Sequence, residues 1–283
     1  MLNKISILLE MIKFKLTLFA MPFAFMGAWL AADGVPPLMV FLWVVLAMVG
    51  ARTCAMGFNR IVDARFDAAN PRTAERAIPA GAVKGWEAWL MVIVAGLLFF
   101  FACYQLNPLT MQLAPVAIFL TLFYSYTKRF TWACHLVLGL ALAFAPLGGW
   151  VAVAGTLSGF PWSLAAGVFF WVAGFDTIYA CLDADFDKQA GLHSMPARFG
   201  RQGAFRLAVF FHLLAFILFV TTGLAANLGW IYFTGCAITA AALFYQHLIV
   251  VPHDLSRIGV SFFTMNGTIS LTLFLATGLD LAL

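Results

Sequence analysis

Long apolar segments, separated by short polar connections, run through almost the whole chain of 283 residues. Only 10% of the residues are charged, whereas a soluble globular domain has about a quarter. The apolar runs are continuous and do not alternate with polar residues, which favours membrane-spanning helices over the strands of a closed barrel. The sequence therefore predicts an all-α integral membrane protein that forms one domain over residues 1–283.

Nine of these segments are close to the ~20 residues that a helix needs to cross the hydrocarbon core of a bilayer. They are residues 16–32, 38–56, 88–104, 110–125, 134–154, 162–181, 204–224, 229–250 and 261–281. We expect nine transmembrane helices around a central cavity.

The basic residues test this count, because nine spans place successive connections on alternating sides of the membrane. All 16 lysines and arginines fall at the N-terminus or in every second connection and its helix ends. The other side carries only Asp33 and, in the C-terminal tail, Asp280. The positive-inside rule then predicts a cytoplasmic N-terminus. The net charge of +4 is thus a signal of topology and gives no reason to expect a nucleic-acid partner. No protein partner can be inferred.

Two clusters of carboxylates lie at predicted cytoplasmic helix ends. The first comprises Asn59, Asp63 and Asp67, and the second comprises Asp176, Tyr179, Asp183 and Asp187. In each cluster the spacing keeps the side chains along one face of a helix that continues from the span. Carboxylates near a bilayer usually have a charged partner. Two facing pairs would suit two Mg²⁺ ions that bridge a diphosphate, because Mg²⁺ commonly takes one or two carboxylates together with phosphate oxygens. The alternative is that the acids only solvate helix ends beside basic residues. Asp185 points off the shared face and is expected to take no part.

Further motifs accompany the two clusters. Asn70-Pro71-Arg72-Thr73 and Arg76-Ala77-Ile78-Pro79-Ala80-Gly81 follow the first cluster, Asp176-Thr177-x-Tyr179-Ala180 opens the second, and Tyr124-Ser125-Tyr126-Thr127-Lys128-Arg129 stands between them. Together with the nine spans, these motifs resemble the UbiA superfamily of intramembrane aromatic prenyltransferases over the whole chain. Many relatives have Asn-Asp at the start of the first motif, whereas Arg60 follows Asn59 here. This form is similar to a bacterial subgroup labelled 4-hydroxybenzoate polyprenyltransferase or assigned to menaquinone synthesis.

The resemblance implies a reaction and the residues that perform it. The implied catalytic residues and Mg²⁺ ligands are Asp63, Asp67, Asp183 and Asp187, with Asn59 as a further ligand or an orienting group. The implied substrate-binding residues are Asn59, Arg72, Arg76, Lys128, Arg129, Asp176, Tyr179 and Arg198. The metal ions would neutralise charge on the leaving group of a polyprenyl diphosphate. The allylic carbocation would then be attacked by the ring of a 4-hydroxybenzoate-type acid, whose carboxylate Arg198 is expected to bind.

Two alternatives stay open. A dihydroxynaphthoate-type acceptor, for menaquinone, would need the same metal-binding motifs. A cation-coupled transporter would also hold acids in a membrane, but it predicts them midway through the spans and not at helix ends beside arginine-rich segments. We expect an enzyme of respiratory quinone synthesis in the bacterial inner membrane, with its active site facing the cytoplasm and an apolar tunnel open to lipid for the prenyl tail. The five scattered cysteines are interpreted as small packing residues.

Overall fold

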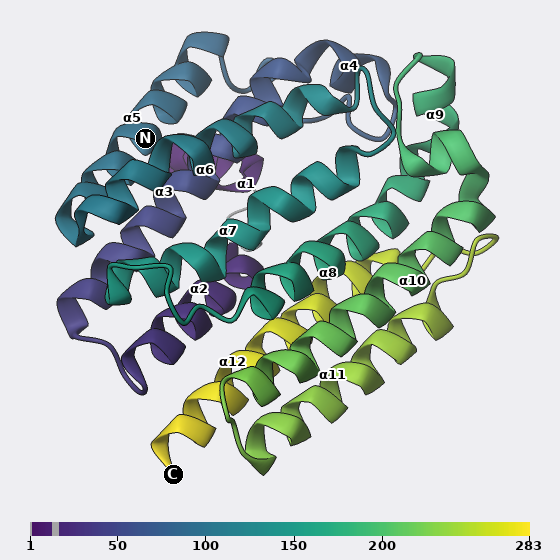
Figure 1. Ribbon diagram of the computed structural model, residues 1–283. Helices are drawn as coiled ribbons and strands as arrows, with labels where there is room; N and C mark the ends of the chain where they lie inside the picture. Colours follow the sequence, from purple (N-terminus) through teal and green to yellow (C-terminus); the bar gives the residue numbers. More distant parts are fainter. Residues whose placement is uncertain (1, 13–16) are drawn as a thin grey trace.

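The computed structural model describes residues 2–12 and 17–283, and this part of the chain folds into helices without β-strands (Figure 1). Its long helices are α2 (Thr17–Ala32), α3 (Leu38–Val62), α5 (Gly85–Leu106), α6 (Pro108–Thr127), α7 (Cys134–Ala154), α8 (Trp162–Ala180), α10 (Met195–Ala225), α11 (Trp230–Ile249) and α12 (Asn266–Ala282). Within the described residues these long helices coincide with the nine predicted segments. The short helices are α1 (Leu2–Met11), α4 (Ala64–Ala69) and α9 (Ala184–Gln189), and a π-helical turn at Val260–Met265 leads into α12.

Seven helical segments in the described chain are long and apolar enough to cross a membrane. They are α3, α5, α6, α7, α8 with its continuation to Gln189, α10, and α12 with its preceding turn. The apolar part of α2, Met21–Ala32, is shorter, and α11 carries the polar residues Gln246 and His247 in its last turn. The predicted all-helical membrane fold is therefore confirmed, while the count of nine spans stays a prediction.

The outer faces of the long helices are apolar. Leu97 on α5, Phe119 on α6 and Leu213 on α10 each expose more than half of their surface, which is the pattern of helices that contact lipid tails. Exposed tryptophans lie at opposite ends of the molecule, with Trp86 at the start of α5 and Trp230 at the start of α11. Such aromatic residues prefer the two membrane–water interfaces, so their positions agree with helices that cross the bilayer.

Helices α2 and α7 are in close backbone contact because glycines remove the side chains from their interface. A Cβ atom on Gly27 would lie 2.0 Å from the carbonyl oxygen of Pro146, and one on Gly149 would lie 1.9 Å from the carbonyl oxygen of Ala24. No side chain fits at either glycine, as in other small-residue interfaces between membrane helices. This contact, together with contacts to α6 and α8, places α7 at the centre of the molecule.

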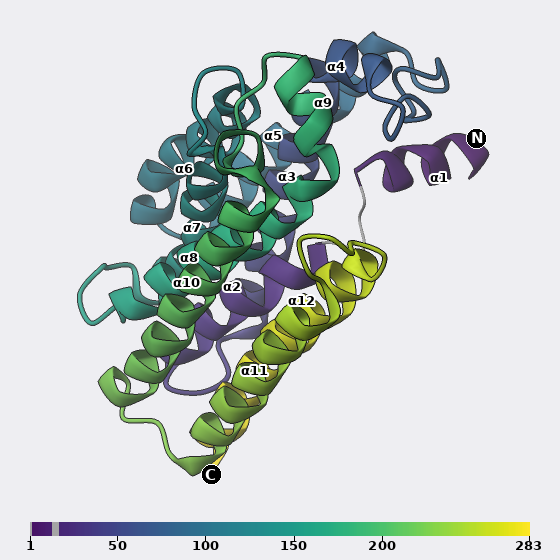
Figure 2. The same cartoon turned by 90° about the vertical axis from the view of Figure 1, so that its right-hand side faces the viewer.

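The polar connections that contain α4 and α9 lie side by side at one end of the molecule (Figures 1 and 2). Helix α1 lies beside the connection from α4 to α5 (Figure 2). There the ammonium of Lys4 is 2.8 Å from a carboxylate oxygen of Glu87, and Arg60 donates through Nε to the carbonyl of Met11 at 3.2 Å. Arg60, the residue that departs from the usual motif, thus joins α3 to the end of α1.

The core on the other side of α7 is formed by α8, α10, α11 and α12. Trp171, Phe219 and Tyr232 are fully buried there. All five cysteines are buried and free, and Cys103 and Cys134 also line the cavity. At the far end, the carboxylate of Asp280 accepts hydrogen bonds from the backbone amides of Gly229 and Tyr232 and so caps the first turn of α11.

Candidate active site

Each acidic cluster lies where a long helix is interrupted. Asp63 separates α3 from α4 with φ −89° and ψ 0°, and Asp183 precedes α9 with φ −105° and ψ 5°. Both residues occupy the sparsely populated bridge region of backbone conformation, where many active-site residues are found. The prediction that each helix runs unbroken through its cluster is therefore wrong. The carboxylates of both clusters nevertheless line one cavity.

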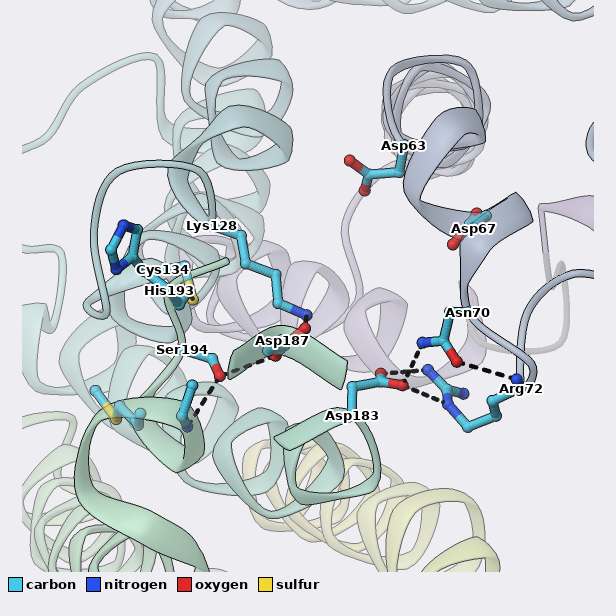
Figure 3. A network of polar contacts seen from close by, with 12 residues as sticks. Asp63, Asp67, Asn70, Arg72, Lys128, Cys134, Asp183, Asp187, His193 and Ser194 are labelled. Atoms are coloured by element: carbon cyan, nitrogen blue, oxygen red, sulfur yellow. Dashed lines mark hydrogen bonds and ion pairs between the residues drawn. The ribbon is translucent and has the colours of Figure 1, made fainter. Parts of the chain in front are cut away.

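The four predicted metal-binding aspartates each contact one of the four predicted phosphate-binding cations. Figure 3 shows two of these contacts, Arg72 with Asp183 and Lys128 with Asp187. The nitrogen–oxygen distances are 3.6 Å for Arg129 and Asp63, 2.6 Å for Arg76 and Asp67, 2.7 Å for Lys128 and Asp187, and 2.8 Å from Nε of Arg72 to Oδ1 of Asp183. Each of the four carboxylates is thus paired with a cation at the mouth of the cavity.

The loop after the first cluster reaches across to the second cluster. Asn70 donates from Nδ2 to Oδ1 of Asp183 at 2.9 Å, and its own Oδ1 accepts from the backbone amide of Arg72 at 3.0 Å. Arg72 contacts the same carboxylate through its guanidinium (Figure 3). Residues 113 positions apart in the sequence are therefore held together by this loop, which makes one site out of two motifs.

Ser194 supports the second cluster and was not among the predicted site residues. Its hydroxyl donates to Oδ2 of Asp187 at 2.9 Å and accepts from the amide of Ala197 at 3.3 Å. The second bond caps the start of α10. A serine two residues before Pro196 has the pattern of a helix N-cap, so its position was detectable from the sequence, although its contact with Asp187 was not.

Burial and the neighbouring carboxylate of Asp67 raise the pKa of the Asp63 carboxyl above its ordinary value. Asn59 donates from Nδ2 to Oδ2 of Asp63 at 2.8 Å, so it orients this carboxylate. When the pKa of a carboxyl group is raised by burial and by a like charge, a cation that binds beside it stabilises the ionised form.

The carboxylate sets fit a hard divalent cation. Oδ2 of Asp67 is buried without a hydrogen-bond partner, and every donor atom offered by the aspartates is an oxygen, the ligand type that Mg²⁺ prefers. Within residues 2–12 and 17–283, no three histidine, cysteine, aspartate or glutamate side chains form a ready-made metal cluster. The two aspartate pairs would therefore need further oxygen ligands, which a diphosphate can supply.

Below this polar mouth the cavity continues between α3, α6 and α7, with a volume of about 410 Å³. Arg52 on α3 lines this deeper part, ten residues before the helix ends at Val62 and so about 15 Å along its axis. Its Nε is buried without a partner, and the described residues provide no ion pair for it. From the sequence, Arg52 was interpreted only as a topology signal. Its position well inside an apolar span could have identified Arg52 from the sequence, because charged residues there usually mark functional sites.

The remaining predicted residues separate into two groups. Asp176 and Tyr179 line the cavity: Oδ2 of Asp176 is 2.7 Å from Nδ1 of His135, and the guanidinium of Arg72 lies 5.7 Å from the centre of the Tyr179 ring. Arg198 does not line the cavity, because its side chain is exposed on the outer surface of α10. The geometry thus gives no support for contact between Arg198 and an acceptor. Asp185 is also exposed, as expected, and pairs with an arginine of α10 at 2.8 Å.

Comparison with known proteins assigns this arrangement to a family. Residues 20–268 match the family model described as the UbiA prenyltransferase family. The chain belongs to the UbiA prenyltransferase family. It is therefore a multi-pass membrane prenyltransferase, and the transporter alternative is set aside.

Relatives and solved structures agree with this membership. The chain is 32% identical to a 4-hydroxybenzoate octaprenyltransferase of Shewanella woodyi, over 90% of this chain and 88% of that protein. It is 34% identical to a protein of the same name from Nitrosospira multiformis, over 90% and 87%. Among solved structures, the apo form of a UbiA homolog from Aeropyrum pernix has a TM-score of 0.86 at 34% identity and covers 93% of this chain and 97% of that chain. A UbiA homolog from Archaeoglobus fulgidus bound to GPP and Mg²⁺ shares the fold, with a TM-score of 0.76 at 19% identity, and covers 98% of this chain and 100% of that chain.

Proposed function

We propose that this enzyme transfers a polyprenyl group from a polyprenyl diphosphate to an aromatic acid of the 4-hydroxybenzoate type, in respiratory quinone synthesis. The names of the relatives from Shewanella and Nitrosospira support this acceptor. The observation that carries the proposal is the order of charges in the cavity. Four aspartates and four cations surround its mouth, and an arginine without a partner lies below them.

The mouth suits a diphosphate because it holds groups for both the phosphate oxygens and their counterions. When the substrate enters, Arg72, Arg76, Lys128 and Arg129 would leave the carboxylates and bind phosphate oxygens through charge-assisted hydrogen bonds. This exchange frees Asp63, Asp67, Asp183 and Asp187 to hold Mg²⁺. When bound there, Mg²⁺ would neutralise the charge that develops on the leaving diphosphate. Asn59 would keep Asp63 oriented, through the bond that it already makes.

The deeper part of the cavity suits the acceptor. Arg52 lies seven residues before Asn59 on α3, about 10 Å along the helix axis. A one-ring acid whose carboxylate pairs with Arg52 would therefore place its ring between this arginine and the carboxylates, beside Asp176 and Tyr179. The apolar walls would exclude water, which would otherwise capture the allylic carbocation.

The proposed placement in the membrane follows from the same geometry. The connections that contain α4 and α9 lie at one end of the molecule (Figure 1), and the paired aspartates and cations that line the mouth of the cavity belong to this end. We assign this end, with the N-terminus, to the cytoplasmic side of a bacterial inner membrane, and the nine long helices to nine spans of one domain.

A dihydroxynaphthoate-type acid is the second candidate acceptor, because its carboxylate would suit Arg52 equally well. The test is mass spectrometry of lipids from membranes that contain the protein. The membranes are incubated with Mg²⁺, a polyprenyl diphosphate and, separately, 4-hydroxybenzoate or a dihydroxynaphthoate. We expect prenylated 4-hydroxybenzoate that disappears when EDTA is added. Product from the naphthoate alone would transfer the proposal to that acceptor, and product from neither, with folded protein, would overturn the choice of an aromatic acid.

A further inference from the structure

The cavity extends far below the site. Its lining on α7 runs from His135 to Val151, about 24 Å along the helix axis. Thr110 and Val151 at the deep end are buried. Asn107 donates from Nδ2 to the carbonyls of Val151 at 2.7 Å and Ala152 at 3.2 Å. These bonds join the start of α6 to the end of α7 at the deep end of the cavity, away from the carboxylates.

Two adjacent glycines on α7 have opposite surroundings at this deep end. A Cβ atom on Gly149 would collide with the backbone of α2, so helix packing requires that glycine. Apart from its two chain neighbours and the adjacent backbone of α7, a Cβ atom on Gly148 would have no heavy atom within 4 Å, although Gly148 also lines the cavity. Packing therefore does not require glycine at position 148. The missing side chain leaves open space inside the cavity.

We propose that Gly148 determines how long a prenyl chain the cavity can hold, an inference that rests on the proposed function. Gly148 lies 13 residues beyond His135 on α7, about 20 Å along the axis. Each isoprene unit adds four carbon–carbon bonds to the chain, about 5 Å when extended. A chain that starts at the carboxylates thus reaches Gly148 with about its fourth unit. Because an extended octaprenyl chain is about twice this length, its last units must turn back or leave between helices.

Larger side chains at position 148 test this inference. In Gly148→Phe, the ratio of kcat/KM for geranylgeranyl diphosphate to that for geranyl diphosphate should fall at least tenfold. Gly148→Leu should give a smaller fall, and Gly148→Ala almost none, because each side chain fills a different share of the open space. Leu140→Phe is the matched control, since Leu140 is exposed on the outer face of the same helix. We expect it to leave the ratio unchanged.

The two-unit substrate keeps the test separate from the proposed function. Its chain ends well before Gly148, so its turnover reports that each variant is folded and that prenyl transfer occurs. An unchanged ratio in Gly148→Phe and Gly148→Leu, with geranyl turnover intact, would overturn the inference and mean that the chain leaves the cavity before α7 ends. Absence of turnover with both substrates in the unmodified enzyme would instead contradict the proposed function.

Discussion

Replacement of Arg52 by glutamine tests the proposed acceptor site. The guanidinium of Arg52 lines the cavity and has no partner within the described chain. Truncation of one partner of a buried, hydrogen-bonded charge pair costs about 2–5 kcal/mol. Because Arg52 is only partly buried, we expect a value in the lower part of this range, about 3 kcal/mol, which corresponds to a factor of about 100 in affinity.

The assay is steady-state kinetics of the purified enzyme in detergent, with each substrate varied in turn. Arg52→Gln should raise KM for the aromatic acid about 100-fold and leave KM for the prenyl diphosphate unchanged. Arg52→Lys should retain part of the affinity, because it keeps the charge but loses the two-pronged geometry. Arg198→Ala is the matched control, since that arginine is exposed outside the cavity, and it should behave like the unmodified enzyme.

A phenol without a carboxylate completes this test. With such an acceptor, Arg52→Gln and the unmodified enzyme should have the same kcat/KM, because the lost interaction is absent in both. The variant should also melt at the same or a higher temperature, since it no longer holds a partly buried charged group without a partner. An equal loss of activity with the carboxylate-free phenol, or an unchanged KM for the aromatic acid, would refute the assignment of Arg52.

Three further predictions concern the carboxylates. Asp63→Asn and Asp183→Asn should each lower Mg²⁺-dependent kcat, measured by product formation, by about 100-fold or more. The control Asp185→Asn, which removes an exposed acid of the same segment, should not lower it. Full activity in either of the first two variants would exclude the two-cluster site. Removal of divalent metal with EDTA should abolish turnover without lowering the melting temperature, because all four aspartates are already neutralised by cations; loss of the fold on chelation would show that the metal is structural. Asp280→Ala should destabilise the protein by about 1 kcal/mol, because the cap of α11 is lost. The expected readout is a lower melting temperature with normal kcat. An unchanged melting temperature would show that water replaces the cap.

The helices and the candidate aspartates were predictable because their signals are local. Long apolar runs must be helical in a membrane, where each backbone polar group needs a partner within its own segment. The four-residue spacing in Asn59, Asp63 and Asp67 is likewise visible without any tertiary contact. Local spacing did not reveal that both motifs turn at an aspartate in the bridge region, because Asp63 and Asp183 also contact residues far away in the sequence, Arg129 and Asn70.

Tertiary structure alone decided which charges meet. Arg72 follows the first motif but contacts Asp183 of the second, and Lys128 reaches Asp187 from the connection between α6 and α7. Charge placement along the chain assigned Arg52 and Arg198 to the same cytoplasmic class, yet one lines the cavity and the other faces outward. Arg52 lines the cavity because the packing of α3 against its neighbours places that face of the helix toward the cavity. The amino-acid composition of α3 does not determine which face this is.

The adjacent glycines of α7 show the same division between sequence and structure. The sequence by itself determined that this segment is an apolar helix with small residues, which permits close approach of another helix. Only the packed structure decided that Gly149 meets the backbone of α2 while Gly148 faces open space in the cavity. Successive residues on a helix point about 100° apart, so identical neighbours face different surroundings, and those surroundings are built by residues far away in the chain.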